Sequence, residues 1–167
     1  MKQTFLTSVL ALLMAVGGMR ISVSCQSVSD KSDKGHGPGL VGVWVTQVTR
    51  INCDTGEPIV AAPNRIQLTF AKGGTLLETI GPSTVRSAGN GIWKREPGLN
   101  EYSYTVRFMR YDAAGSFVGS GVVRAAITLD VTGNHYTSTA TNDVLDVNGN
   151  VIASGCATSV STRFSME

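Results

Sequence analysis

The sequence predicts an all-β domain folded as an eight-stranded antiparallel up-and-down barrel. From residue 40 onward, β-branched and aromatic residues dominate, and turn residues interrupt them at short intervals, as in successive hairpins. No segment there has a helical period, which excludes parallel βαβ folds. Cys53 ends the first candidate strand and Cys156 lies early in the last, so a bridge between them would pair these strands and close the sheet. A two-sheet β-sandwich also accommodates eight strands with short turns and is the alternative.

The expected strands follow one another through short connections. Lys72-Gly73-Gly74 separates the second strand from the third, and segment 81–90, the longest central connection, is expected to form a lid over one end. Turns of the form Asp-x-x-Gly join the last four strands, because the aspartate caps a type I turn and the glycine adopts the left-handed conformation that closes it. The expected strands are 40–51, 65–71, 74–80, 91–96, 101–111, 116–130, 134–146 and 150–164.

Length and composition bound the function classes. The chain has 167 residues, 42% hydrophobic and 16% charged, which is enough for one domain with a core and excludes a disordered protein. Fourteen Lys+Arg against twelve Asp+Glu give a net charge of +2. Both excess cations, Lys2 and Arg20, lie in the first 24 residues, which contain no acid. The remaining domain is neutral, and this argues against nucleic acid or an anionic membrane as its partner.

The N-terminus has the features of a secretory signal peptide over residues 1–24. A basic start precedes an uncharged apolar run over 5–19, and small residues Ser22 and Ser24 occupy the −3 and −1 positions before Cys25. A permanent transmembrane helix is the competing interpretation, but the run is too short and two glycines and an arginine interrupt its end. We therefore expect an exported protein.

Cys25 lies where a bacterial lipoprotein signal places its lipidated cysteine, although Ser22 stands where leucine is usual. Residues 25–39 are polar, rich in serine and glycine and aperiodic, as in a flexible tether between an anchor and a folded domain over 40–167. A lipid anchor at the cell envelope and free secretion into the periplasm or medium both remain open. A membrane is expected as a partner only through that anchor.

The other two cysteines suit an oxidising compartment. If the first and last strands are antiparallel neighbours, Cys53 and Cys156 meet and form a disulfide. Two separately buried thiols are the alternative. A zinc site is not expected, because two cysteines lack a nearby histidine pair.

Alternation identifies the inward faces of three strands. In the fifth strand Arg107 lies on the face opposite the aromatic residues. Small residues beside aromatic ones either leave a cavity or complement large side chains opposite, and the sequence leaves both open. The expected inward residues are Tyr102, Tyr104, Val106 and Phe108, then Phe117, Gly119, Gly121, Val123, Ala125, Ile127 and Leu129, then Tyr136, Ser138, Ala140, Asn142 and Val144.

Gly42-Val43-Trp44 on the first strand and Arg163 near the end of the last resemble the lipocalin-like barrels of the calycin superfamily. The resemblance implies that Trp44 packs beneath Arg163 and closes one end of the barrel, with the guanidinium over the indole. The chain is similar to small bacterial lipocalin-like proteins more than to typical lipocalins, because Gly89-Asn90-Gly91-Ile92-Trp93 is not a lipocalin hallmark.

Glu78 has two possible positions. It alternates with Leu76 and Ile80, so it points inward if they do, and then needs a raised pKa or a cationic partner such as Arg86 or Arg107. In the other phase Leu77 and Thr79 face inward and Glu78 is solvated, which is the interpretation we favour.

The leading hypothesis is an exported barrel that binds a small apolar or amphipathic molecule. Tyr102, Tyr104, Phe108, Phe117 and Tyr136 are expected around the ligand, with Glu78, Arg107 and Asn142 as polar anchors. Catalytic motifs, metal-ligand spacing and cofactor fingerprints are not found, so no catalytic residue, metal or cofactor is assigned. The alternatives are a filled barrel that binds other proteins through its surface, and a small barrel isomerase or cyclase using Glu78 and a tyrosine as acid and base.

Overall fold

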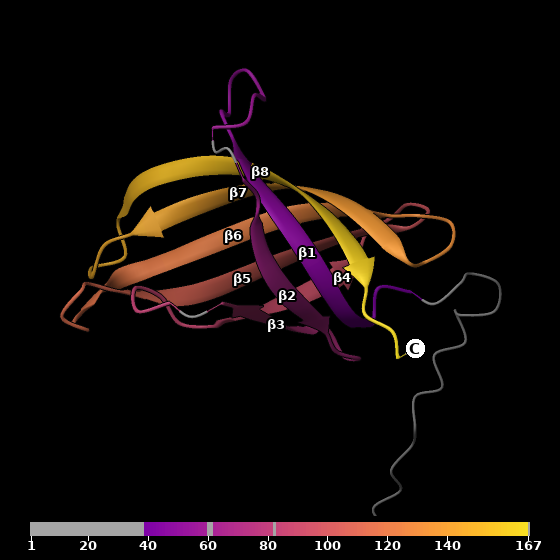
Figure 1. Cartoon of the computed structure of the whole chain (residues 1–167), viewed down its shortest axis with the longest axis horizontal. Helices are drawn as coiled ribbons and strands as arrows, with labels where there is room; N and C mark the ends of the chain where they lie inside the picture. Colours follow the sequence, from indigo (N-terminus) through magenta and orange to yellow (C-terminus); the bar gives the residue numbers. More distant parts are fainter. Residues whose placement is uncertain (1–38, 60–61, 82, 167) are drawn as a thin grey trace, which may run out of the picture. The chain divides into compact units, whose positions relative to one another are not determined.

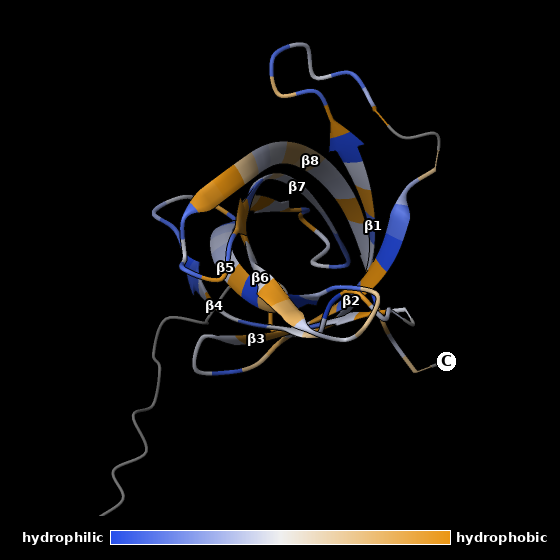
Figure 2. Ribbon diagram, turned by 90° about the vertical axis from the view of Figure 1, so that its left-hand side faces the viewer, coloured by the Kyte–Doolittle hydropathy of each residue, from blue (hydrophilic) through white to orange (hydrophobic). Residues whose placement is uncertain are grey.

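The computed structural model describes residues 39–59, 62–81 and 83–166, and eight strands of this part form a closed barrel (Figure 1). Each strand pairs antiparallel with the next along the chain, and β1 pairs with β8. The strands form one ring rather than two packed sheets (Figure 2), so the up-and-down barrel is confirmed and the sandwich is not. The strands are β1 (Gly42–Ile51), β2 (Asn64–Phe70), β3 (Thr75–Ile80), β4 (Gly89–Arg95), β5 (Glu101–Tyr111), β6 (Phe117–Leu129), β7 (His135–Leu145) and β8 (Val151–Arg163).

Each strand begins and ends within two residues of its expected position. The signal peptide over 1–24, Cys25 and all but the last residue of the tether lie outside the described residues. The part of the chain that the structure describes holds no helix with the length and hydropathy of a membrane span.

The three Asp-x-x-Gly turns form as expected. Asp112 Oδ1 accepts hydrogen bonds from the backbone amides of Ala114 at 2.9 Å and Ser116 at 2.8 Å. Gly115, which closes this turn, has φ of 83°, in the region that favours glycine. The turn that begins at Asp146 repeats this arrangement. In the turn that begins at Asp130, the carboxylate accepts from the amide of Asn134 and from the hydroxyl of Thr132 instead. Local side-chain chemistry therefore sets the register of the long hairpins.

One end of the barrel is sealed by packed side chains around Trp44. The Arg163 Cζ lies 4.3 Å from the centre of the Trp44 ring, which confirms the expected pair. Arg163 also donates to the backbone oxygens of Gly39 at 2.7 Å and Val41 at 2.8 Å. Gly42 suits this position because its φ of 141° lies in the region that favours glycine, and a Cβ on it would also displace Arg163 Nη1. This sealed end contains Leu40, Trp44, Leu68, Phe70, Leu76, Tyr102, Ile127, Leu129 and Tyr136.

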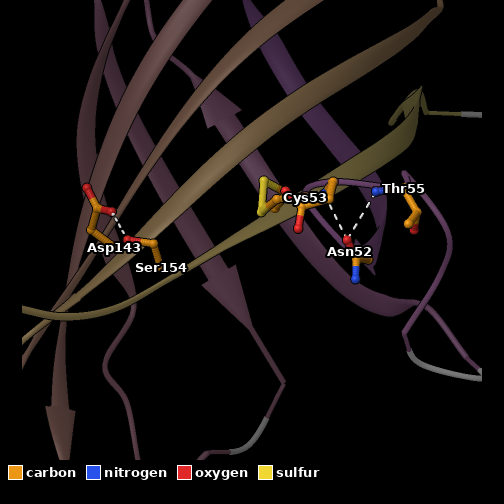
Figure 3. Close-up of a disulfide and its surroundings, with 7 residues drawn as sticks. Asn52, Cys53, Thr55, Asp143 and Ser154 are labelled. Atoms are coloured by element: carbon orange, nitrogen blue, oxygen red, sulfur yellow. Dashed lines mark hydrogen bonds between the residues drawn. A yellow bond between two sulfur atoms is a disulfide. The ribbon is translucent and has the colours of Figure 1, made fainter.

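The Cys53–Cys156 disulfide is present, with the two Cα atoms 5.2 Å apart, and separately buried thiols are not (Figure 3). Ile51 lies opposite Cys156 in the β1–β8 register, so the bridge forms where β1 ends. The side chain of Asn52 accepts hydrogen bonds from the amides of Asp54 and Thr55 at 2.8 and 3.1 Å, which orders the turn that carries Cys53. The bridge therefore ties the connection after β1 covalently to strand β8.

Candidate functional site

A cavity of about 260 Å³ lies in the barrel at the end away from Trp44. The second half of β1, the start of β2, the end of β3, β5 to β8 and the connection before β4 surround it. Its wall combines apolar side chains with polar groups, and the polar groups come from every surrounding strand except β6. The lining residues include Val48, Arg50, Asn64, Ile66, Glu78, Arg86, Tyr104, Phe108, Val123, Ser138, Ala140, Asn142, Val144, Gly155 and Ser159.

Glu78 points into this cavity, so our favoured interpretation of a solvated side chain is wrong. Glu78 is 5% exposed, whereas Leu77 is 44% exposed on the outside. The phase follows from buried Leu76 and from the register that sets Glu78 beside Gly89 of β4. A Cβ on Gly89 would lie 2.6 Å from Glu78 Oε2, so the glycine makes room for the carboxylate. The inward position is therefore built by residues far apart in the sequence.

Arg86 neutralises the carboxylate. Its Nη2 forms an ion pair with Glu78 Oε2, and its Cζ lies 3.4 Å from the centre of the Phe108 ring. The connection that carries Arg86 is held against β5 by a hydrogen bond from the Ser87 amide to the Met109 oxygen at 3.0 Å. The segment that we expected as a lid thus places a guanidinium at the cavity wall, between a carboxylate and an aromatic ring.

Two further polar groups line the cavity without a protein partner. Among the described residues, the buried Oδ1 of Asn142 accepts no hydrogen bond, and none joins the Tyr104 hydroxyl to another side chain or the backbone. Burial, then Tyr136 and Glu78, raise the pKa of Tyr104, so its hydroxyl keeps its proton and acts as a donor. Ser138 and Ser159, by contrast, share a hydrogen bond of 2.7 Å between their hydroxyls.

The expected ligand-binding residues separate into three groups. Tyr104, Phe108, Glu78 and Asn142 line the cavity. Tyr102 and Tyr136 point inward but belong to the packed core of the sealed end. Phe117 and Arg107 lie outside the cavity lining.

The prediction that Phe117 faces inward is wrong because of a β-bulge between β5 and β6. Tyr111 pairs with Phe117 and Arg110 with Gly119, so Val118 is an extra residue that shifts the alternation of β6. Phe117 is consequently 49% exposed and packs edge-on against Tyr111 at 6.4 Å.

Arg107 is exposed on the outer face of β5, where its Nη2 donates to Ser120 Oγ at 2.9 Å. The sequence interpretation named Arg86 only as a partner and missed the β8 residues Gly155 and Ser159. Alternation could have found them, because β8 continues the inward pattern of β7.

Glu78 and His135 each contact another side chain. The carboxylate of Glu78 is held by Arg86. His135 lies at a turn, with its Nδ1 3.4 Å from the Thr162 hydroxyl. Over residues 39–59, 62–81 and 83–166, no three acidic, histidine or cysteine side chains come together as a metal site requires. No protein-family model matches the chain, and no curated protein gives a significant match.

Proposed function

We propose that the protein is an exported, lipocalin-like barrel that binds a small apolar or amphipathic molecule. The binding site is the cavity at the end of the barrel away from Trp44. The observation that carries the proposal is the unfilled volume of about 260 Å³ in a barrel whose other end is tightly packed. Ligand pockets are mostly apolar with a few polar groups, and a volume just below the common range of about 300–1,000 Å³ suits a compact ligand.

The contacts at the sealed end support the lipocalin-like assignment, because Trp44 and Arg163 pack as the resemblance implies. The disulfide between Cys53 and Cys156 supports an oxidising compartment, in agreement with the export features of the N-terminus. The cavity favours a carrier over the filled barrel, since a filled barrel has no internal volume to offer.

Native mass spectrometry of the protein purified from its own host tests this function. We expect a small-molecule adduct that is released on denaturation. A Gly155→Leu variant fills the cavity, because nothing lies within 4 Å of a Cβ at this position, and it should lose the adduct. Thr139→Leu, on the outer face of the neighbouring strand β7, is the matched control and should keep it. An adduct retained by Gly155→Leu would place the ligand elsewhere and contradict the proposal.

A further inference from the structure

We infer that the ligand is an uncharged molecule that donates an N–H or O–H hydrogen bond to Asn142 Oδ1. The inference rests on the proposed function and specifies the chemistry that the cavity selects. It follows from two properties of the cavity wall. The acceptor Asn142 Oδ1 has no donor among the described residues, and the charges of Glu78 and Arg86 already neutralise each other.

Asn142 lies at the middle of the wall, opposite Val123 of β6 and Gly155 of β8. Its Oδ1 is buried, and no donor among the described residues reaches it. Buried acceptors are nearly always hydrogen-bonded in folded proteins, because an unpaired one loses its bond to water without replacement. The open space at Gly155 leaves room for a donor beside it. The partner is therefore expected from a molecule in the cavity, which is water in the free protein and the ligand when it displaces that water.

The charges around the cavity exclude an ionic ligand. A cation would have to displace Arg86 from both Glu78 and the ring of Phe108. An anion would give up its hydration in the cavity and find the guanidinium of Arg86 already paired with Glu78. Arg50 also lines the cavity, but its side chain is exposed and water screens its charge. An uncharged ligand leaves the ion pair intact.

Tyr104 adds a second requirement on the ligand. Its protonated hydroxyl lines the same cavity and has no hydrogen bond to the described residues. A molecule with both a donor and a carbonyl-type acceptor, such as a primary amide on an apolar ring, would satisfy Asn142 and Tyr104 together. Its ring would contact the valine and alanine side chains of the wall.

Four compounds of one size and shape test the inference on the wild-type protein. Benzamide offers a neutral donor and an acceptor, acetophenone only the acceptor, benzamidinium a cation and benzoate an anion. Dissociation constants are measured by titration of the protein's ¹H–¹⁵N NMR spectrum, with the Asn142 side-chain amide as the local reporter. We expect benzamide to bind roughly 3- to 10-fold more tightly than each of the other three, the range of one net hydrogen bond.

Two asparagine variants locate the effect. Asn142→Leu removes the acceptor at similar volume and should reduce the affinity for benzamide to that for acetophenone. Asn90→Leu is the matched control, because Asn90 is exposed on the outer face of β4. It should leave all four dissociation constants unchanged.

The outcomes separate the inference from the function on which it rests. Equal affinities for benzamide and acetophenone would overturn the donated hydrogen bond, and tighter binding of benzoate or benzamidinium would overturn the uncharged ligand. In both cases the cavity would still be a binding site. Shift changes for none of the four compounds at millimolar concentration would instead contradict the proposed function. The wild-type comparison holds even if Asn142→Leu does not fold.

Discussion

The ring of Phe108 on β5 fills the space that a side chain at Gly121 of β6 would occupy. The two residues are directly opposite in the register, and a Cβ built on Gly121 would overlap the ring atoms. A Cβ built on Gly155 of β8, by contrast, would have no neighbouring atom within 4 Å. One inward glycine therefore complements a large side chain, and the other borders the cavity.

This contrast predicts opposite effects of the same substitution. Gly121→Ala should lower the free energy of unfolding by about 1–3 kcal/mol, because it overpacks the barrel against Phe108. Gly155→Ala should leave stability unchanged or raise it by up to about 1 kcal/mol, because it adds a methyl group in open space and restricts the unfolded chain. Urea unfolding of both variants measures the difference. Equal losses would show that the two positions do not differ in packing.

The sealed end predicts a large effect of Arg163→Ala. The variant loses the contact with Trp44 and the hydrogen bonds to the backbone of Gly39 and Val41, so we expect a loss of about 2–4 kcal/mol. Arg163→Lys should recover less than half of this, because an ammonium group cannot reproduce the planar arrangement of donors.

The control is Arg65→Ala on the outside of β2, which should change stability by no more than about 0.5 kcal/mol. Thermal and urea unfolding measure all three variants. An Arg163→Ala variant as stable as Arg65→Ala would show that the cap over Trp44 does not contribute to stability.

The ion pair in the cavity predicts unequal effects of its two partners. Arg86→Gln leaves the buried carboxylate of Glu78 without its cation and should cost about 3 kcal/mol or more. Glu78→Gln should cost less, because the side chain of Arg86 is 22% exposed and can turn toward water. Replacing both by leucine should be at least as stable as Arg86→Gln alone. Unfolding of the three variants at pH 7 tests this order, and a larger loss for Glu78→Gln would reverse the assignment.

Two carboxylates of the β7–β8 hairpin, Asp143 in β7 and Asp146 in the turn that follows it, predict how stability changes with pH. Hydrogen bonds from the side chain and backbone of Asn150 hold the pKa of Asp146 below its ordinary value of 3.8. Hydrogen bonds from Ser154 and Arg124 do the same for Asp143. A carboxylate with a lowered folded-state pKa stabilises the fold above the unfolded-state pKa, and this contribution is lost as pH falls. The free energy of unfolding should therefore decrease below about pH 4.

Asp146→Asn and Asp143→Asn remove these titrations. Combined in one chain, they should reduce the loss of stability below about pH 4, as measured by urea unfolding between pH 3 and pH 7. Part of the loss should remain, because Glu96 and Asp130 also have a lowered pKa. A double variant whose stability runs parallel to that of the wild type over this range would assign the acid sensitivity to other groups.

The fold could be predicted from local chemistry, because the information lies within each hairpin. Asp112 and Gly115 specify their turn without reference to the rest of the chain. Alternation likewise placed Tyr104 and Asn142 on the inside. It gives the face of a residue but not its depth in the barrel, so it could not tell Tyr136 of the packed end from Tyr104 of the cavity.

The predictions for Glu78 and Phe117 were wrong because residues distant in the sequence determine which way these side chains face. In β3 both phases present apolar residues, and the inward phase of Glu78 depends on Gly89 and Arg86, which no local pattern of β3 contains. Phe117 was assigned by an alternation that the extra residue Val118 interrupts. Whether the barrel is filled depends on individual pairs such as Phe108 with its facing glycine, which become visible only in the register.

The pairing of β1 with β8 also determines at which end of the barrel the chain enters and leaves. Trp44 lies opposite Arg163, and the Phe164 amide donates to the Val43 oxygen at 2.8 Å. The chain therefore enters and leaves the barrel at its sealed end. Gly39 and Phe164 both lie at the end of the barrel opposite the cavity. A partner fused directly before Gly39 should accordingly leave access to the cavity open.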